Sequence, residues 1–236
     1  MDAPKSQPAS PPESQPGSLP GRIYLLAYDL ERRQLFDRTR TAFLTRAAVL
    51  IELAWRGQLD ADGHPAATGP GTAGAGTTGP DATGDLVLDR ALAQIRPHRR
   101  SWKRLLRRDY RQTLDLVEQQ LKSAGLIRRT RHRALGLVPR YAIELLDDGP
   151  AAEAQARFTS VLRDGPAVDE VSRTDAALVA LAAAGRVRTV ISHADRRRYG
   201  DRITALTDRL GATSPGLANA VRGIEMTIVA ARGGSG

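Results

Sequence analysis

The chain of 236 residues contains no cysteine. This absence excludes a disulfide scaffold, thiolate catalysis, cysteine-based zinc sites and iron–sulfur clusters, and it fits a cytoplasmic protein. No metalloprotease, nucleophile-elbow or phosphate-loop motif is present either. The four histidines lie far apart, at His64, His98, His132 and His193. We therefore expect no enzymatic activity, no metal site and no cofactor.

Long apolar runs are also missing. The longest, Ala176 to Ala184, has nine residues, whereas a helix that crosses a bilayer needs about 20. Residues 1–20 are rich in Pro, Ser and Gln and lack the apolar core of a signal peptide. We expect these residues to form a disordered tail and any contact with a membrane to be peripheral.

Lysine is scarce, since 32 of the 35 basic residues are arginine. With so much alanine and glycine, this preference indicates a GC-rich genome and says little about function. The clustering of charge is more informative. Residues 96–140 contain 14 basic and 3 acidic residues, a net charge of +11, while the rest of the chain is close to neutral.

Apolar periodicity predicts a mainly α-helical protein, with residues 21–232 as a single domain. Two segments interrupt the helices: a flexible loop over 64–84 and an apolar β-hairpin over 126–146. The loop contains a Gly-x-Gly-x-x-Gly match at 69–74, but it lacks the strand and helix that a dinucleotide site needs. Helices are expected at 39–56, 102–124, 151–163, 172–185, 195–210 and 216–231. Residues 85–95 should begin as a short strand and turn helical.

Two parts of the basic segment suggest a docking surface. The expected helix 102–124, with Ser101 as its N-cap, continues a basic stripe formed by Arg100, Arg104, Arg107, Arg108 and Arg111. The hairpin that follows has basic arms and an apolar tip around Leu135, Leu137 and Val138. A cationic face beside an apolar loop is typical of proteins that dock on anionic membranes.

Other interpretations of the same residues remain open. A helix followed by a basic hairpin is also found in winged-helix proteins that bind DNA, and the isoelectric point near 10.7 suits nucleic acid. The apolar tip favours a membrane, because a DNA-binding wing usually carries basic residues at its end. The hairpin could instead fold back on the core, and the basic face could meet an acidic protein.

Three stretches together resemble the Golgi phosphoprotein 3 family of peripheral phosphoinositide-binding proteins, which has bacterial relatives. They are RAAVLIELAWRG at 46–57, TGDLVLDRAL at 83–92 and LKSAGLI at 121–127, and DAALVALA at 175–182 extends the match. The resemblance implies a helical bundle ringed by amphipathic helices, with a projecting apolar β-hairpin that enters the membrane.

The family's pocket for phosphatidylinositol 4-phosphate uses one tryptophan and three arginines. Arg46 and Arg111 match two of these arginines, but Asp37 stands in place of the tryptophan and Leu114 in place of the third arginine. Because Asp37 should repel a dianionic headgroup, we expect binding to anionic lipids in general rather than to this lipid alone. No lipid-specific site and no protein cargo can be assigned from the residues.

These observations predict a protein that binds the cytoplasmic leaflet and does no chemistry. The residues expected to meet lipid headgroups are Arg46, Arg104, Arg107, Arg108 and Arg111. Those expected to insert into the membrane are Leu135, Leu137 and Val138.

Overall fold

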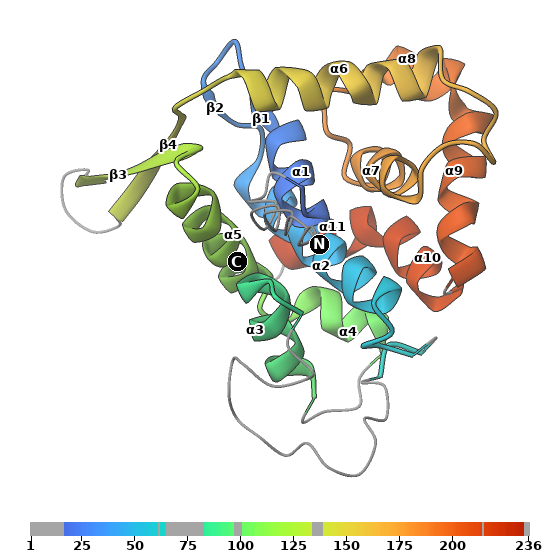
Figure 1. Cartoon of the computed structure of the whole chain (residues 1–236), viewed down its shortest axis with the longest axis horizontal. Coiled ribbons are helices and arrows are strands. Elements are labelled where there is room, and N and C mark those ends of the chain that lie inside the picture. The colour runs from blue at the N-terminus through green and yellow to red at the C-terminus, as the bar shows by residue number, and fades with distance from the viewer. Residues whose placement is uncertain are drawn as a thin grey trace, which may run out of the picture.

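The computed structural model describes residues 17–60, 62–64, 83–96, 101–133, 139–213 and 215–233. These residues form a mainly α-helical protein, as the sequence predicts (Figure 1). Eleven helices lie within the described ranges: α1 Leu19–Leu26, α2 Arg38–Trp55, α3 Leu86–Ile95, α4 Trp102–Arg107, α5 Tyr110–Ser123, α6 Gly149–Arg163, α7 Arg173–Ala184, α8 His193–Arg198, α9 Gly200–Thr213, α10 Pro215–Arg222 and α11 Ile224–Gly233. The strands form two antiparallel pairs: β1 Tyr28–Asp29 with β2 Gln34–Leu35, and β3 Ile127–Arg133 with β4 Pro139–Leu145.

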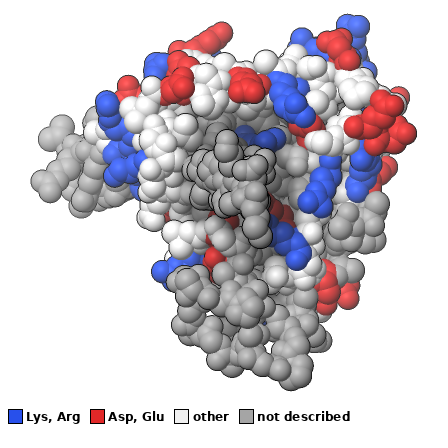
Figure 2. Space-filling model, in the orientation of Figure 1, with Lys and Arg blue, Asp and Glu red and all other residues white. Residues whose placement is uncertain are grey.

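Charged side chains of both signs are spread over the surface. On the face shown in Figure 2, the described basic and acidic side chains are interspersed. Within this view, no patch of a single sign covers the described surface. The positive charge that the sequence concentrates in residues 96–140 lies largely on α4, α5 and β3.

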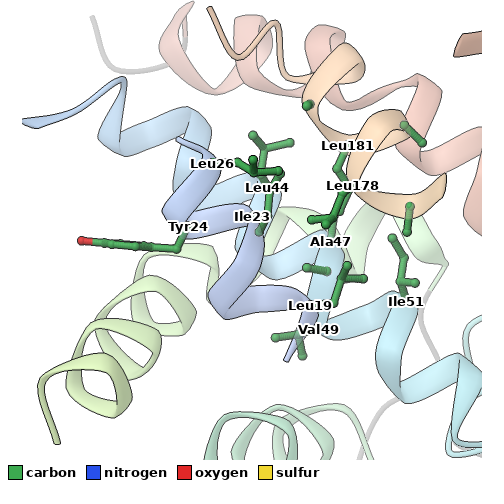
Figure 3. Close-up of a cluster of buried hydrophobic side chains, with 14 of the residues drawn as sticks. Leu19, Ile23, Tyr24, Leu26, Leu44, Ala47, Val49, Ile51, Leu178 and Leu181 are labelled. Carbon is green, nitrogen blue, oxygen red and sulfur yellow. The ribbon is translucent and has the colours of Figure 1, made fainter. Parts of the chain in front are cut away.

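Helix α2 forms the centre of the bundle. Every residue from Thr41 to Ile51 is buried, and a helix that is buried on all sides belongs to a core. Helices α1, α3, α4, α5, α7 and α11 all contact it. Figure 3 shows Leu178 and Leu181 of α7 beside Ala47 of α2, with Ile23 of α1 close by.

Capping residues set the ends of two predicted helices. Asp37 begins α2 by accepting a hydrogen bond from the Arg40 backbone N–H at 3.0 Å. Gly57, with φ +69°, follows its end as predicted. The strand expected at the start of 85–95 is wrong, because Asp85 accepts hydrogen bonds from two backbone N–H groups and starts α3 at once.

The β3–β4 hairpin occupies the predicted segment and lies at one edge of the molecule (Figure 1). Its base is packed on the body, where Ile127, Ile143 and Leu145 are buried. The Tyr28 hydroxyl donates a hydrogen bond to the Ile143 carbonyl at 3.4 Å. The tip lies outside the described residues, so the predicted insertion of Leu135, Leu137 and Val138 remains a prediction.

Several predicted boundaries are wrong. Helix α1 begins at Leu19, inside the expected tail, because Ser18 caps it and Leu19 is buried. The helices expected at 195–210 and 216–231 are each divided in two, and a glycine at 200 or 223 lies at each break. Most of the loop predicted over 64–84, and residues 1–16 of the tail, lie outside the described residues. Among the helices that are described, none combines the length and the apolar character that crossing a bilayer requires.

Candidate functional site

The basic stripe does not lie on one continuous helix. The predicted helix 102–124 is broken between α4 and α5, where Arg108 is extended and Asp109 adopts a left-handed conformation with φ +55°. In an unbroken helix the Leu105 carbonyl would accept a hydrogen bond from the backbone N–H of residue 109. Here the Nε of Arg46 donates to that carbonyl at 3.1 Å. A side chain of α2 therefore replaces a backbone hydrogen bond at the break.

Arg46 is buried rather than exposed. Its side chain is only 1% accessible, and its second bond goes from Nη1 to the Thr113 hydroxyl at 3.3 Å. Burial lowers the pKa of Arg46 to about 10, an effect that nearby Asp109 opposes and nearby Arg108 reinforces. Arg46 was expected to meet a lipid headgroup, whereas the structure places its side chain in the core. Its guanidinium joins α2 to the α4–α5 break and stays charged at neutral pH.

The other four predicted headgroup ligands are exposed: Arg104, Arg107, Arg108 and Arg111. Arg108 pairs with the Asp109 carboxylate at 3.1 Å, and the Arg111 guanidinium lies 5.5 Å from the centre of the Tyr110 ring. In the part of the chain that the structure describes, neither Arg104 nor Arg107 makes an ion pair. We call Lys103 and these four arginines the α4–α5 basic surface.

A pocket of about 610 Å³ adjoins this surface. Its walls come mainly from α4, α10 and α11 and include Lys103, Arg107, Trp102, Leu106, Ala220 and Met226, and one carboxylate, that of Asp62, also lines it. Met226 is 73% exposed and is therefore an unusually accessible apolar side chain. No sequence pattern marks this pocket, because α4 is far from α10 and α11 in the chain. An apolar hollow beside two cations suits an amphiphile with an anionic head.

A network of charges around one buried carboxylate fastens the hairpin to the bundle. Glu118 of α5 is fully buried and accepts hydrogen bonds from Arg38, one of them at 3.0 Å, and from the Tyr24 hydroxyl at 3.4 Å. Arg129 of β3 lies 3.7 Å from the same carboxylate and 3.2 Å from Asp115. Burial, reinforced by Glu118, raises the pKa of Tyr24 well above its usual value. Strand β3 is therefore held against α5 by charge as well as by packing.

The two positions that depart from the family's lipid pocket serve the fold here. Asp37 caps α2 and pairs with Arg40 at 3.3 Å. Leu114 is buried in the core. With Arg46 also buried, only Arg111 of the four corresponding positions presents a cation to solvent.

No group of metal-binding side chains is found among the described residues. A family model described as Golgi phosphoprotein 3 (GPP34) matches residues 19–227. The match therefore spans the bundle, the α4–α5 basic surface and the hairpin. No curated protein matches the chain at a significant level.

Proposed function

The chain belongs to the Golgi phosphoprotein 3 family, and from this premise we propose that it is a peripheral membrane protein that binds anionic phospholipids. Family membership supports a lipid-binding role and favours lipid over nucleic acid as the anionic partner. The observation that carries the proposal is the α4–α5 basic surface beside an apolar pocket.

Electrostatic attraction provides the first contribution to binding. Each arginine near an anionic bilayer contributes about 1 kcal/mol, so four exposed arginines supply roughly 4 kcal/mol. That is enough for weak and reversible attachment. The pocket beside Arg107 then offers space for part of an acyl chain. The role proposed for Arg46 is indirect, since it holds the break that presents the surface.

Insertion of the hairpin tip provides the second contribution. Leu135, Leu137 and Val138 would enter the acyl boundary, where a fully buried leucine contributes roughly 1.5–3 kcal/mol. The ion pairs of Arg129 support this proposal, because they give the hairpin a firm base on the bundle.

We further propose that binding depends on the charge of the membrane and not on phosphatidylinositol 4-phosphate in particular. The carboxylate of Asp37 and the apolar Leu114 each remove a favourable contact with that headgroup, and the burial of Arg46 removes another. The cytoplasmic leaflet, which carries most anionic lipid, is the proposed site of attachment.

Flotation with vesicles tests the proposal. The wild-type protein should float with vesicles that mix phosphatidylserine with phosphatidylcholine, and this binding should weaken as salt is raised. It should not bind vesicles of pure phosphatidylcholine. The double variant Arg107→Glu with Arg111→Glu should abolish the salt-sensitive binding. A matched control is Arg173→Glu with Arg198→Glu, because Arg198 also stacks on an adjacent tyrosine, at 5.6 Å, and Arg173 on a tryptophan, at 4.9 Å.

Equal loss of binding in the two double variants would show that net charge alone is responsible and would refute the assignment to α4 and α5. A preference of more than tenfold for phosphatidylinositol 4-phosphate at matched charge would refute the proposed lack of selectivity. Stronger binding to duplex DNA than to anionic vesicles, measured by gel shift, would favour the nucleic-acid alternative.

A further inference from the structure

A second pocket, of about 510 Å³, is lined by the segment that links α7 to α8 and by α8 itself. It shares no lining residue with the pocket beside α4. Its polar lining contains four arginines, a serine and a histidine, and no carboxylate: Arg186, Arg188, Arg196, Arg197, Ser192 and His193. We call it the α8 pocket.

Two carboxylates close to the lining residues, those of Asp195 and Glu225, are already engaged. Asp195 accepts hydrogen bonds from the Ser192 backbone N–H at 3.1 Å and from its hydroxyl at 2.6 Å, and it also pairs with Arg163 at 3.1 Å. Glu225 pairs with Arg186 at 2.6 Å. Three arginines of the α8 pocket are left without an ion pair in the described part of the chain: Arg188, Arg196 and Arg197.

Arg196 provides a second, independent observation. Its Nη1 atom is buried and has no hydrogen-bond partner among the described residues. Buried donors are almost always paired, so Nη1 requires an acceptor, which a water molecule or a bound anion would supply. Burial lowers the pKa of Arg196, and the nearby charges of Arg186 and Arg40 lower it further, while the Glu225 carboxylate opposes them. A bound anion would accept a hydrogen bond from Nη1 and would reduce the repulsion between the arginines.

We propose that the α8 pocket binds a phosphate group carried by a phosphate ester or a short polyphosphate. Guanidinium groups bind phosphate through paired N–H···O bonds, and several arginines around one pocket match the charge and the oxygens of a dianion. The Ser192 hydroxyl is already committed to Asp195, so the arginines supply the contacts.

Calorimetric titration of the full chain with inorganic pyrophosphate, at constant ionic strength, tests the site. Arg196→Gln should weaken binding at least tenfold, which corresponds to about 1.4 kcal/mol. The double variant Arg188→Gln with Arg197→Gln should do the same through exposed residues that do not endanger folding. Arg198→Gln is the matched control, because it removes the same charge from the same helix but does not line the pocket. It should change affinity less than twofold.

Absence of pyrophosphate binding by the wild type, or an equal loss in Arg198→Gln, would overturn the proposal. Flotation of the same variants with phosphatidic acid vesicles identifies the source of the phosphate. Reduced flotation of Arg196→Gln would assign a lipid headgroup to the pocket. Unchanged flotation together with lost pyrophosphate binding would assign a soluble phosphate compound. Because no residue of the α4–α5 basic surface is altered, a difference in pyrophosphate binding between the variants tests the α8 pocket separately from the proposed membrane attachment.

Discussion

Replacing Glu118 by glutamine should destabilise the protein far more than replacing Asp115 by asparagine. Glu118 and Asp115 lie on the same helix and pair with the same two arginines, Arg38 and Arg129. They differ in exposure, since the Glu118 side chain is 0% exposed and that of Asp115 is 43% exposed. The pair of variants therefore compares a buried and a half-exposed carboxylate that share the same two arginines; Glu118 also accepts a hydrogen bond from Tyr24.

The size of the effect follows from the contacts. Breaking a buried ion pair costs about 3–5 kcal/mol. Arg38 is 44% exposed and can regain water, so we expect Glu118→Gln to lower the free energy of unfolding by about 2–4 kcal/mol. For a chain of this size the melting temperature should fall by roughly 5–15 °C. Asp115→Asn breaks only a partly exposed pair and should cost no more than about 1 kcal/mol.

Scanning calorimetry at pH 7 measures both variants, and hydrogen exchange locates the change. Exchange should rise first in β3, which Arg129 anchors, and least in α9, which packs mainly on α7 and α10. Equal destabilisation by the two variants would refute the reasoning, because burial would then have no effect on the strength of these pairs. A loss below about 1 kcal/mol for Glu118→Gln would do the same.

Three further changes test other parts of the structure. Arg46→Met should destabilise the protein by about 1–3 kcal/mol in urea denaturation, because a buried carbonyl loses its donor, although removal of a buried charge offsets part of this. Burial alone would raise the pKa of Asp175, but hydrogen bonds led by that of Arg157 outweigh burial and hold the pKa below its usual value. The stabilisation by the pair of Arg157 and Asp175 is therefore complete above about pH 4 and is lost as the pH falls through the folded pKa of Asp175. Arg157→Gln should accordingly be less stable than the wild type at neutral pH, and this difference should shrink in acid unfolding curves. Gly63→Ala should lower the free energy of unfolding by about 2–4 kcal/mol, because φ is +84° and the new Cβ would lie 2.8 Å from the buried indole of Trp102. Its control, Gly125→Ala, has φ +71° and open space around the Cβ and should cost only about 1 kcal/mol; thermal unfolding measures both.

Local patterns were enough to predict the bundle but not the interruptions in it. The apolar spacing of α2 and the glycine after it are local signals, and both predictions are confirmed. The spacing of Leu106, Tyr110 and Leu114 also fits an unbroken helix, and nothing nearby in the sequence marks the break at Asp109. That break depends on a contact with Arg46, which is 59 residues from Leu105.

The burial of Arg46 could have been anticipated. It lies within a stretch of α2 whose neighbours on both sides are apolar or small, so exposing this arginine would have exposed them too. The resemblance to a lipid pocket favoured the opposite interpretation. The pocket beside α4 could not have been predicted, because it depends on how α4 packs near α10 and α11, which are far away in the chain.

The charged base of the hairpin has a mechanical consequence. Arg129 is the third residue of β3, so its ion pairs lie about 7 Å along the strand from Ile127 and about 13 Å from Arg133. The strand is therefore a lever whose outer arm is about twice its inner arm. A sideways force on the outer end would reach the bundle as a torque on α5 and α2 through Glu118. Ion pairs strengthen where the dielectric constant is low, so this pivot would stiffen as the hairpin approached a bilayer.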